Sequence, residues 1–308
     1  MVVRTWGSVV AALGLAVVLA GAATAELATV TERPGRIVFA SDREGASESA
    51  FDVFRVRGFP KELTDVEGDN LMPTWSANGA RIAFVNSGLT GQPDLHVMNA
   101  DGSDGTQLTD DLLFDVEPSW FPGGERIAFS KSEKIYTMPA GKRSGRDPTR
   151  LTRQAGVESQ PSVSPDGKRI AFVSDRDGDF DVYVMEVAPG SKANRPVKLT
   201  DNTTDESYPD WSPDGKRISF SSGEVGDRDV YVMKAAPQSR ANRPVNLTDA
   251  AGDDSDPAWS PGGKKLAFVS DRTGDDEIWT MEADGTSLTN LTRRPDSQDI
   301  QPDWRPLP

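Results

Sequence analysis

The chain has 308 residues, no cysteine and one histidine, and its formal net charge is −14 at pH 7. The lack of cysteine excludes disulfides and cysteine-based metal sites within this sequence. The excess of acid argues against binding to nucleic acid or to an anionic membrane, because both need clustered Lys and Arg. We therefore expect a protein that is held together by its core and recognises neither of these partners.

Residues 1–25 have the layout of a cleaved secretory signal. Arg4 is followed by a short apolar run, and the segment ends in Ala-Thr-Ala at 23–25. The run is short for a membrane span, and the small residues are typical of a cleavage site. We expect cleavage after Ala25, a lead-in at 26–34 and a secreted or periplasmic chain that is not inserted in the membrane. An uncleaved N-terminal anchor is the alternative.

One phrase recurs along the rest of the chain. It reads PSVSPDGKRIAF at 161–172, PDWSPDGKRISF at 209–220 and PAWSPGGKKLAF at 257–268. The Trp of the phrase, or its equivalent, is spaced by 45, 43, 48, 48 and 45 residues, at Trp75, Trp120, Val163, Trp211, Trp259 and Trp304. A period in the forties with strand-like segments is typical of a propeller blade of four strands.

Each unit predicts four strands. In the unit that begins at residue 209 they are expected at 209–212, 216–222, 229–235 and 245–249. Asp214-Gly215 suits the tight turn after the first strand. The second strand carries successive apolar residues, such as IAFVS at 170–174, so both of its faces must be buried. Neighbouring blades on either side would provide that cover.

The two ends of the chain predict ring closure. The first unit begins directly at a second strand, GRIVFASD at 35–42, and the last residues, QPDWRP at 301–306, supply a Trp strand with nothing after it. Together they complete one blade, which would pair the open edges. We therefore expect an all-β, six-bladed propeller of four-stranded antiparallel blades over 35–308, closed by its N- and C-terminal segments. Seven blades is the alternative.

The repeat resembles the TolB-type propeller repeat. The matching strings are PSVSPDGKRIAFVSD, DVYVME and KLTD in one unit and PAWSPGGKKLAFVSD, EIWTME and NLTR in another. The resemblance covers 35 to about 306 and implies a TolB-like propeller domain alone. TolB carries an α/β domain ahead of its propeller, and prolyl-oligopeptidase-like enzymes carry a hydrolase domain after theirs. The expected propeller leaves room for neither, and this argues against both complete activities.

The sequence offers little for catalysis. The single histidine, His96, fills an aromatic position of a third strand in DLHVM, where other units have DVYVM. We interpret it as a structural substitution. A Ser-His-Asp or Cys-His arrangement would need His96, and a His-rich zinc site is not possible. We therefore expect no enzyme activity and no catalytic residues.

One acidic stretch resembles a calcium-binding loop. DRDGDFD at 175–181 places carboxylates at alternate positions around a glycine, at Asp175, Asp177, Asp179 and Asp181. Hard cations prefer several such oxygens from a flexible turn. The twelfth position is Glu186, but it follows a strand-like run where an EF-hand would have a helix. Since Ser-Asp-Arg recurs in other units, a purely structural role in ordering the turn is the alternative, and no other cofactor is expected.

The leading functional hypothesis is an exported binding module. A propeller presents variable loops on a rigid scaffold, and recognition usually lies in such loops. The most variable loops are 41–51, 86–94 and 221–229, and we expect a protein or peptide partner for a monomeric propeller. A calcium-dependent enzyme of lactonase or lyase type is the alternative. A carbohydrate-binding sensor is a third, for which only Phe51 and Phe180 are candidates.

Overall fold

The computed structural model describes residues 37–43, 51–57, 59–64, 66–88, 91–141, 148–187, 195–236, 243–294 and 296–306. These ranges belong to one compact unit, Pro34–Pro308. The expected signal sequence at 1–25 and lead-in at 26–34 lie outside the described residues, so both stay predictions. No helix within the described ranges is long and apolar enough to cross a membrane.

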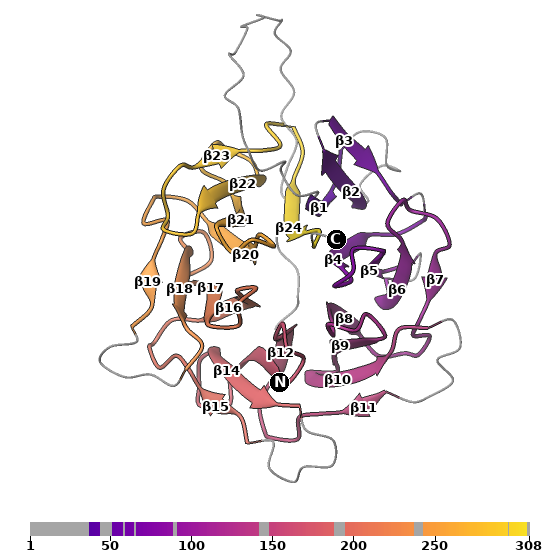
Figure 1. Cartoon of the computed structure of the whole chain (residues 1–308), viewed down its shortest axis with the longest axis horizontal. Coiled ribbons are helices and arrows are strands. Elements are labelled where there is room, and N and C mark those ends of the chain that lie inside the picture. The colour runs from indigo at the N-terminus through magenta and orange to yellow at the C-terminus, as the bar shows by residue number, and fades with distance from the viewer. Residues whose placement is uncertain are drawn as a thin grey trace, which may run out of the picture. The chain divides into compact units, whose positions relative to one another are not determined.

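Every regular element in these ranges is a β-strand, and the strands form six sheets of four antiparallel strands. From the centre outward (Figure 1), blade 1 consists of β24 (Asp299–Trp304), β1 (Ile37–Ser41), β2 (Asp52–Arg57) and β3 (Phe59–Glu62). Blade 2 consists of β4 (Asn70–Trp75), β5 (Arg81–Asn86), β6 (Asp94–Asn99) and β7 (Thr106–Gln107). Blade 3 consists of β8 (Asp115–Trp120), β9 (Arg126–Lys131), β10 (Lys134–Pro139) and β11 (Thr149–Arg150).

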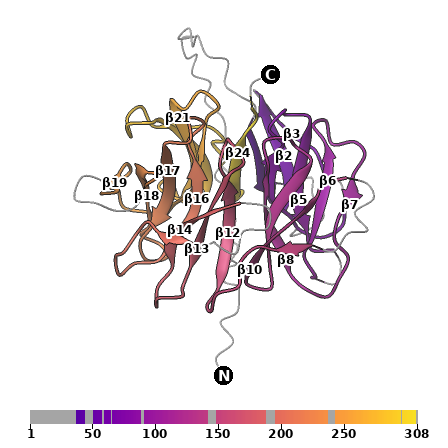
Figure 2. The same ribbon diagram turned by 60° about the horizontal axis from the view of Figure 1, so that its bottom comes forward.

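The remaining three blades repeat this order. Blade 4 consists of β12 (Glu158–Val163), β13 (Arg169–Ser174), β14 (Asp181–Glu186) and β15 (Val197–Lys198). Blade 5 consists of β16 (Glu206–Trp211), β17 (Arg217–Ser222), β18 (Asp229–Lys234) and β19 (Val245–Asn246). Blade 6 consists of β20 (Asp254–Trp259), β21 (Lys265–Ser270), β22 (Glu277–Glu282) and β23 (Thr289–Asn290). Figure 2 shows the same ring tilted, with β12 at the front.

The two ends of the described chain share blade 1. β24 pairs antiparallel with β1, so that Trp304 lies opposite Ile37 and Asp303 lies opposite Val38. The inner strands contact one another in a closed succession, from β24 through β4, β8, β12, β16 and β20 back to β24. This pairing covers the edge that β1 would otherwise expose. The predicted six-bladed propeller is confirmed, and the seven-bladed alternative is wrong.

The hydrophobic core lies between the blades. There are six buried clusters in the described chain, and each joins two neighbouring blades. Between blades 4 and 5, for example, Ala171 and Val173 of β13 pack with Trp211 and Phe220. On the opposite face of β13, Ile170 packs in the cluster shared with blade 3. The second strands are therefore buried on both faces, which explains their continuous apolar sequence.

The recurring phrase builds a turn that its own serine holds closed. Ser212 Oγ donates to Asp214 Oδ1 at 2.6 Å and accepts from the Arg217 amide at 2.9 Å. Gly215 has a φ of 66°, a left-handed conformation that glycine adopts without strain. The Ser-Pro-Asp-Gly part of the phrase therefore connects the inner strand to the second strand within one blade.

The arginine after this turn connects one blade to the next. The Arg169 guanidinium lies 4.4 Å from the ring centroid of Trp211 and donates to the Gly215 carbonyl at 3.1 Å. Arg305 lies 5.0 Å from the Trp75 ring in the same way, across the closure of the ring. Equivalent stacks join Arg81 to Trp120 and Arg217 to Trp259. Cation–π contacts of this kind stabilise by about 0.5–2 kcal/mol each, so the phrase also holds the blades together.

Candidate functional site

The six inner strands enclose a central cavity of about 160 Å³. Each inner strand lines it with three successive residues that have proline in the middle, such as Tyr208-Pro209-Asp210. The residue before this proline has a positive φ of 51–58° in every blade, at Met72, Glu117, Gln160, Tyr208, Asp256 and Gln301. The pairing between inner and second strand is irregular at the same place in each blade, as in a β-bulge, which re-aims side chains.

Side chains at this position bind the next blade around the ring. Glu117 Oε2 accepts a hydrogen bond from the Gln160 amide at 2.6 Å, and Gln160 Oε1 accepts from the Tyr208 amide at 2.7 Å. Gln301 Oε1 accepts from the Met72 amide at 2.8 Å. These polar side chains therefore satisfy main-chain donors that the bulges remove from the sheets, and they hold neighbouring blades in register.

Two aspartates after the prolines make the same kind of contact. Asp210 Oδ2 accepts from the Trp259 amide at 2.8 Å, and Asp303 Oδ2 accepts from the Trp75 amide at 2.6 Å. Burial raises the pKa of Asp210 to about 7 and the pKa of Asp303 to about 6, although these hydrogen bonds oppose the rise. Both carboxyl groups therefore titrate near neutral pH while they join adjacent blades.

Several charged side chains interact with Tyr208. Burial raises the pKa of Asp256 to about 7, and the positive charge of Arg228 opposes this rise. The negative charge of Asp256, together with burial, raises the pKa of Tyr208 well above its ordinary value. Arg228 is itself held by Asp253, with Nε 2.7 Å from Oδ1. Glu117 Oε1 and Asp256 Oδ1 are buried and have no hydrogen-bond partner within the described ranges.

These channel residues were not among those predicted from the sequence. The sequence feature that marks them is a proline two residues before each Trp position. In five of the six units a polar or acidic residue directly precedes this proline. Nothing in one strand indicates that six such segments converge, because the strands are 43–48 residues apart in the sequence. Only the closed ring brings Glu117, Tyr208 and Asp256 to one cavity.

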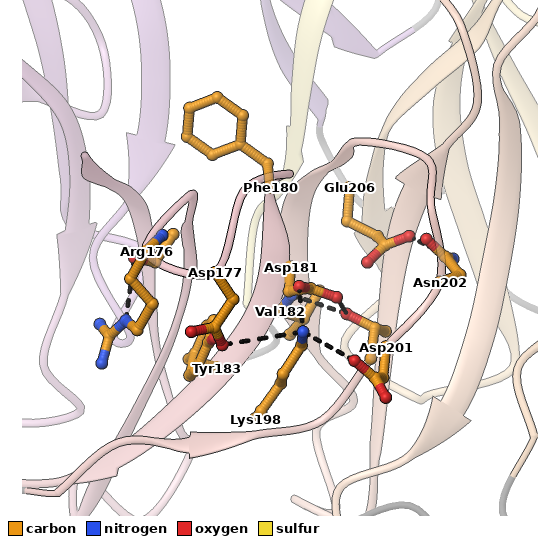
Figure 3. A network of polar contacts seen from close by, with 12 residues as sticks. Arg176, Asp177, Phe180, Asp181, Val182, Tyr183, Lys198, Asp201, Asn202 and Glu206 are labelled. Atoms are coloured by element: carbon orange, nitrogen blue, oxygen red, sulfur yellow. Dashed lines mark hydrogen bonds and ion pairs between the residues drawn. The ribbon is translucent and has the colours of Figure 1, made fainter. Parts of the chain in front are cut away.

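The four aspartates predicted to bind calcium run from the turn after β13 to the first residue of β14, and two of them, Asp177 and Asp181, lie beside the ammonium group of Lys198 (Figure 3). Lys198 Nζ lies 2.7 Å from Asp181 Oδ2, 2.8 Å from Asp201 Oδ1 and 3.7 Å from Asp177 Oδ2. Three carboxylates therefore already share one cation that belongs to the protein. Asp201 was not among the predicted residues.

The other members of the predicted calcium set are separated from this group. Asp175 Oδ1 accepts from the Val157 amide at 2.6 Å, and Glu186 is exposed at the far end of β14. Asp179 Oδ2 is buried without a hydrogen-bond partner in the described part of the chain. Among the described residues, no group of three or more His, Cys, Asp or Glu has an arrangement that could hold a metal ion. Calcium binding here stays a prediction.

The recurring Leu-Thr and Ser-Asp-Arg strings have structural roles. Thr200 Oγ1 donates to Asp181 Oδ1 at 3.1 Å and accepts from the Val182 amide at 2.8 Å. The Arg176 guanidinium binds the buried Glu158 carboxylate at 2.6 Å. The same Arg–acid pair recurs in blades 1 and 6, as Arg43 with Asp299 and Arg272 with Asp254. These arginines connect the turn after the second strand to the first residue of the inner strand.

His96 occupies the aromatic position that the sequence assigns to it. It lies opposite Phe84 in the β5–β6 pair, with ring centroids 5.4 Å apart. Burial lowers the pKa of His96 below its ordinary value, so the ring is neutral at physiological pH. The ring therefore packs in the place of the Tyr183 and Tyr231 rings of other blades.

The variable loops named from the sequence connect the second and third strands of blades 1, 2 and 5. Residues 44–50 and 89–90 of these loops lie outside the described residues. Phe51 and Phe180, the carbohydrate candidates, are half-buried, and Phe180 packs against the core between blades 4 and 5.

Comparison with known proteins agrees with this architecture. Residues 197–307 match the model of the TolB beta propeller domain. The Tol-Pal system protein TolB of Desulfosudis oleivorans is 32% identical over 120 residues, which cover 35% of this chain and 26% of that protein. The chain thus matches about a quarter of this relative's length.

Solved structures with the same fold include proteins of different activities. TolB from Acinetobacter baumannii superposes with a TM-score of 0.75 at 22% identity, over 89% of this chain and 67% of that one. Oligogalacturonate lyase from Vibrio parahaemolyticus superposes with a TM-score of 0.52 at 11% identity, over 84% and 74% of the two chains. These likenesses concern the fold alone. Taken with the sequence matches, they support one conclusion, that this chain is a TolB-like β-propeller.

Proposed function

We propose that this chain is an exported, non-catalytic propeller that binds a protein or peptide partner in the cell envelope or outside the cell. The observation that carries the proposal is the use of the channel side chains. Glu117, Asp210 and Asp303 accept main-chain hydrogen bonds from the next blade. Carboxylates engaged in this way maintain a rigid ring, and a rigid ring with variable loops is a scaffold for recognition.

The name of the Desulfosudis relative, a Tol-Pal system protein, supports a protein partner in the envelope. Export is supported by the layout of residues 1–25. Intact-mass analysis of the chain from its producing cell tests this part, and a mature N-terminus at Glu26 is expected. Recovery of the complete chain with its first 25 residues would contradict export by a cleaved signal.

Partner binding is tested by cross-linking the purified chain to envelope extract and to culture supernatant, followed by mass spectrometry. We expect the same protein to be enriched in independent experiments. Excess unlabelled chain, added before cross-linking, should reduce the yield of that protein. A yield that excess chain does not reduce would contradict specific binding. A monomer is expected in light scattering, since β24 pairs with the edge of β1 that blade 1 would otherwise expose.

A calcium-dependent lactonase- or lyase-like enzyme is the second candidate. It is favoured by the channel carboxyl oxygens of Glu117 and Asp256, which lack hydrogen-bond partners among the described residues, since buried acids with raised pKa values also occur in active sites. Thermal unfolding with and without EDTA separates the two candidates. A large fall in melting temperature with EDTA would favour the enzyme, whereas an unchanged temperature is expected for the binding module.

A further inference from the structure

The loop 110–114, between β7 and β8, displays three consecutive apolar side chains to solvent. Leu112 is 91% exposed, Leu113 46% and Phe114 58%. Each blade has a loop that leads into its inner strand, and within the described ranges only this one exposes more than one large apolar side chain. Since isolated exposed apolar residues are common but clusters mark interaction sites, this departure from the repeat indicates a binding surface.

This loop is anchored on both sides of its apolar residues. The Leu113 amide donates to Asp111 Oδ1 at 2.9 Å. Lys131 Nζ binds Asp111 Oδ2 at 2.6 Å and Asp115 Oδ1 at 2.8 Å. Lys131 occupies the end of β9, where blades 1, 4 and 6 have the serine of Ser-Asp-Arg. None of the three apolar residues belongs to a core cluster, so the anchors order the loop without burying them.

The surroundings of the apolar residues are acidic. Burial raises the pKa of Asp94, and the negative charges of Asp110 and Asp111 add to this rise. Burial likewise raises the pKa of Asp115, and the negative charge of Asp111 adds to it. With Lys131 as the cation that binds Asp111 and Asp115, the formal charge of these five groups is −4 + 1 = −3. Such a field attracts Lys and Arg and repels anionic lipid. A second copy of this chain, with a net charge of −14, would be repelled as well.

We infer that loop 110–114 binds a basic amphipathic peptide segment of a partner protein. Large apolar side chains of the segment pack on Leu112, Leu113 and Phe114, and its flanking Lys or Arg residues face Asp110 and Asp111. The anchored loop needs little ordering on binding, so most of the contact energy is retained. This inference rests on the proposed binding function and names the class of partner.

The test is selection of peptides from a phage-displayed library of random 12-residue sequences on the purified chain. The selected consensus should combine large apolar residues with at least two Lys or Arg. A synthetic peptide of that consensus should bind the L112S/F114S variant at least about tenfold more weakly, since the variant lacks two of the three apolar side chains on which the peptide packs. D110N should weaken binding about threefold and reduce its dependence on salt.

L288S is the matched control, because Leu288 is 41% exposed in the turn between β22 and β23, outside loop 110–114 and the variable loops. Its affinity for the peptide should equal that of the unchanged chain. Equal binding of the peptide to L112S/F114S, or a consensus without basic residues, would overturn the inference but leave a binding module intact. If the library yields no peptide and cross-linking yields no partner, both this inference and the proposed binding function fail.

Discussion

At the scale of single residues, several acids of the described chain accept hydrogen bonds or ion pairs from the protein's own donors. The turn that resembles a calcium loop illustrates this, because Lys198 occupies the space among Asp177, Asp181 and Asp201. A bound cation and a lysine ammonium satisfy the same requirement for positive charge. The pattern of alternating aspartates therefore cannot by itself distinguish the two.

Replacement of Lys198 by methionine distinguishes them. We expect K198M to lower the free energy of unfolding by about 1–3 kcal/mol, because it leaves the buried Asp181 carboxylate without its cation. Added calcium should restore part of this loss in the variant and leave the melting temperature of the unchanged chain where it was. Lys216, exposed at the turn before β17, provides the control K216M. Stabilisation of the unchanged chain by calcium would instead support a metal at this turn.

At the scale of elements, each inner strand combines a bulge and a proline, and β24, β8, β12 and β16 also carry a side chain that accepts a main-chain hydrogen bond from the next blade. The bulge bends the strand and frees main-chain donors, and the side chains of the preceding blade accept them. Asp210 shows the consequence, since its carboxyl group lines the channel and accepts a hydrogen bond from the Trp259 amide at 2.8 Å. Contacts between blades are thus polar at the channel and apolar farther out.

The channel acids predict greater stability in mild acid than at pH 8. The pKa of Asp210 is about 7 and that of Asp303 about 6 in the folded chain, above the ordinary value of 3.8. The folded state therefore binds more protons, and this contribution is complete below about pH 4 and lost as the pH rises through 6 and 7. Urea unfolding should give a free energy on the order of 1 kcal/mol per group higher at about pH 5 than at pH 8.

The variant D210N tests the assignment of this pH dependence. Its carboxamide oxygen can still accept from the Trp259 amide, but it does not titrate. The difference between the two pH values should therefore shrink in D210N. The exposed Asp110 supplies a control, D110N, which should keep the full difference. If the pH dependence of the unfolding free energy is unchanged in D210N, it arises from titratable groups other than Asp210.

The contact between blades is tested at Arg169. We expect R169M to lower the free energy of unfolding by about 1–2 kcal/mol, because it removes the stack on Trp211 and the hydrogen bond to the Gly215 carbonyl. The neighbouring Lys168 is exposed, so K168M should change stability by less than about 0.5 kcal/mol. Chemical denaturation measures the free energy of unfolding of both variants. A similar loss in R169M and K168M would argue against a stabilising stack of Arg169 on Trp211.

At the scale of the whole molecule, stability depends on closure of the ring. Trp304 is buried in the cluster between blades 6 and 1. W304A should cost about 3–5 kcal/mol, as large core truncations do. Trp279 lies in the third strand of blade 6 and is half-buried, so W279A should cost clearly less. Thermal and urea unfolding compare the two variants, and equal losses would mean that the closing strand contributes no more than an ordinary blade position.

The repeat and its strands can be predicted from the sequence. The number of blades and the closing role of Trp304 can be predicted as well, because the periods can be counted along the chain and its two ends supply complementary parts of one blade. Turn residues and apolar runs act locally, so they can be read from one unit. The environment of each acid, in contrast, depends on contacts that form only in the folded ring. Glu117 and Asp256 meet at the channel because six distant strands converge there, and Lys198 reaches Asp177 and Asp181 because β15 pairs with β14. Charge and burial depend on such convergence, and no spacing within one unit specifies it.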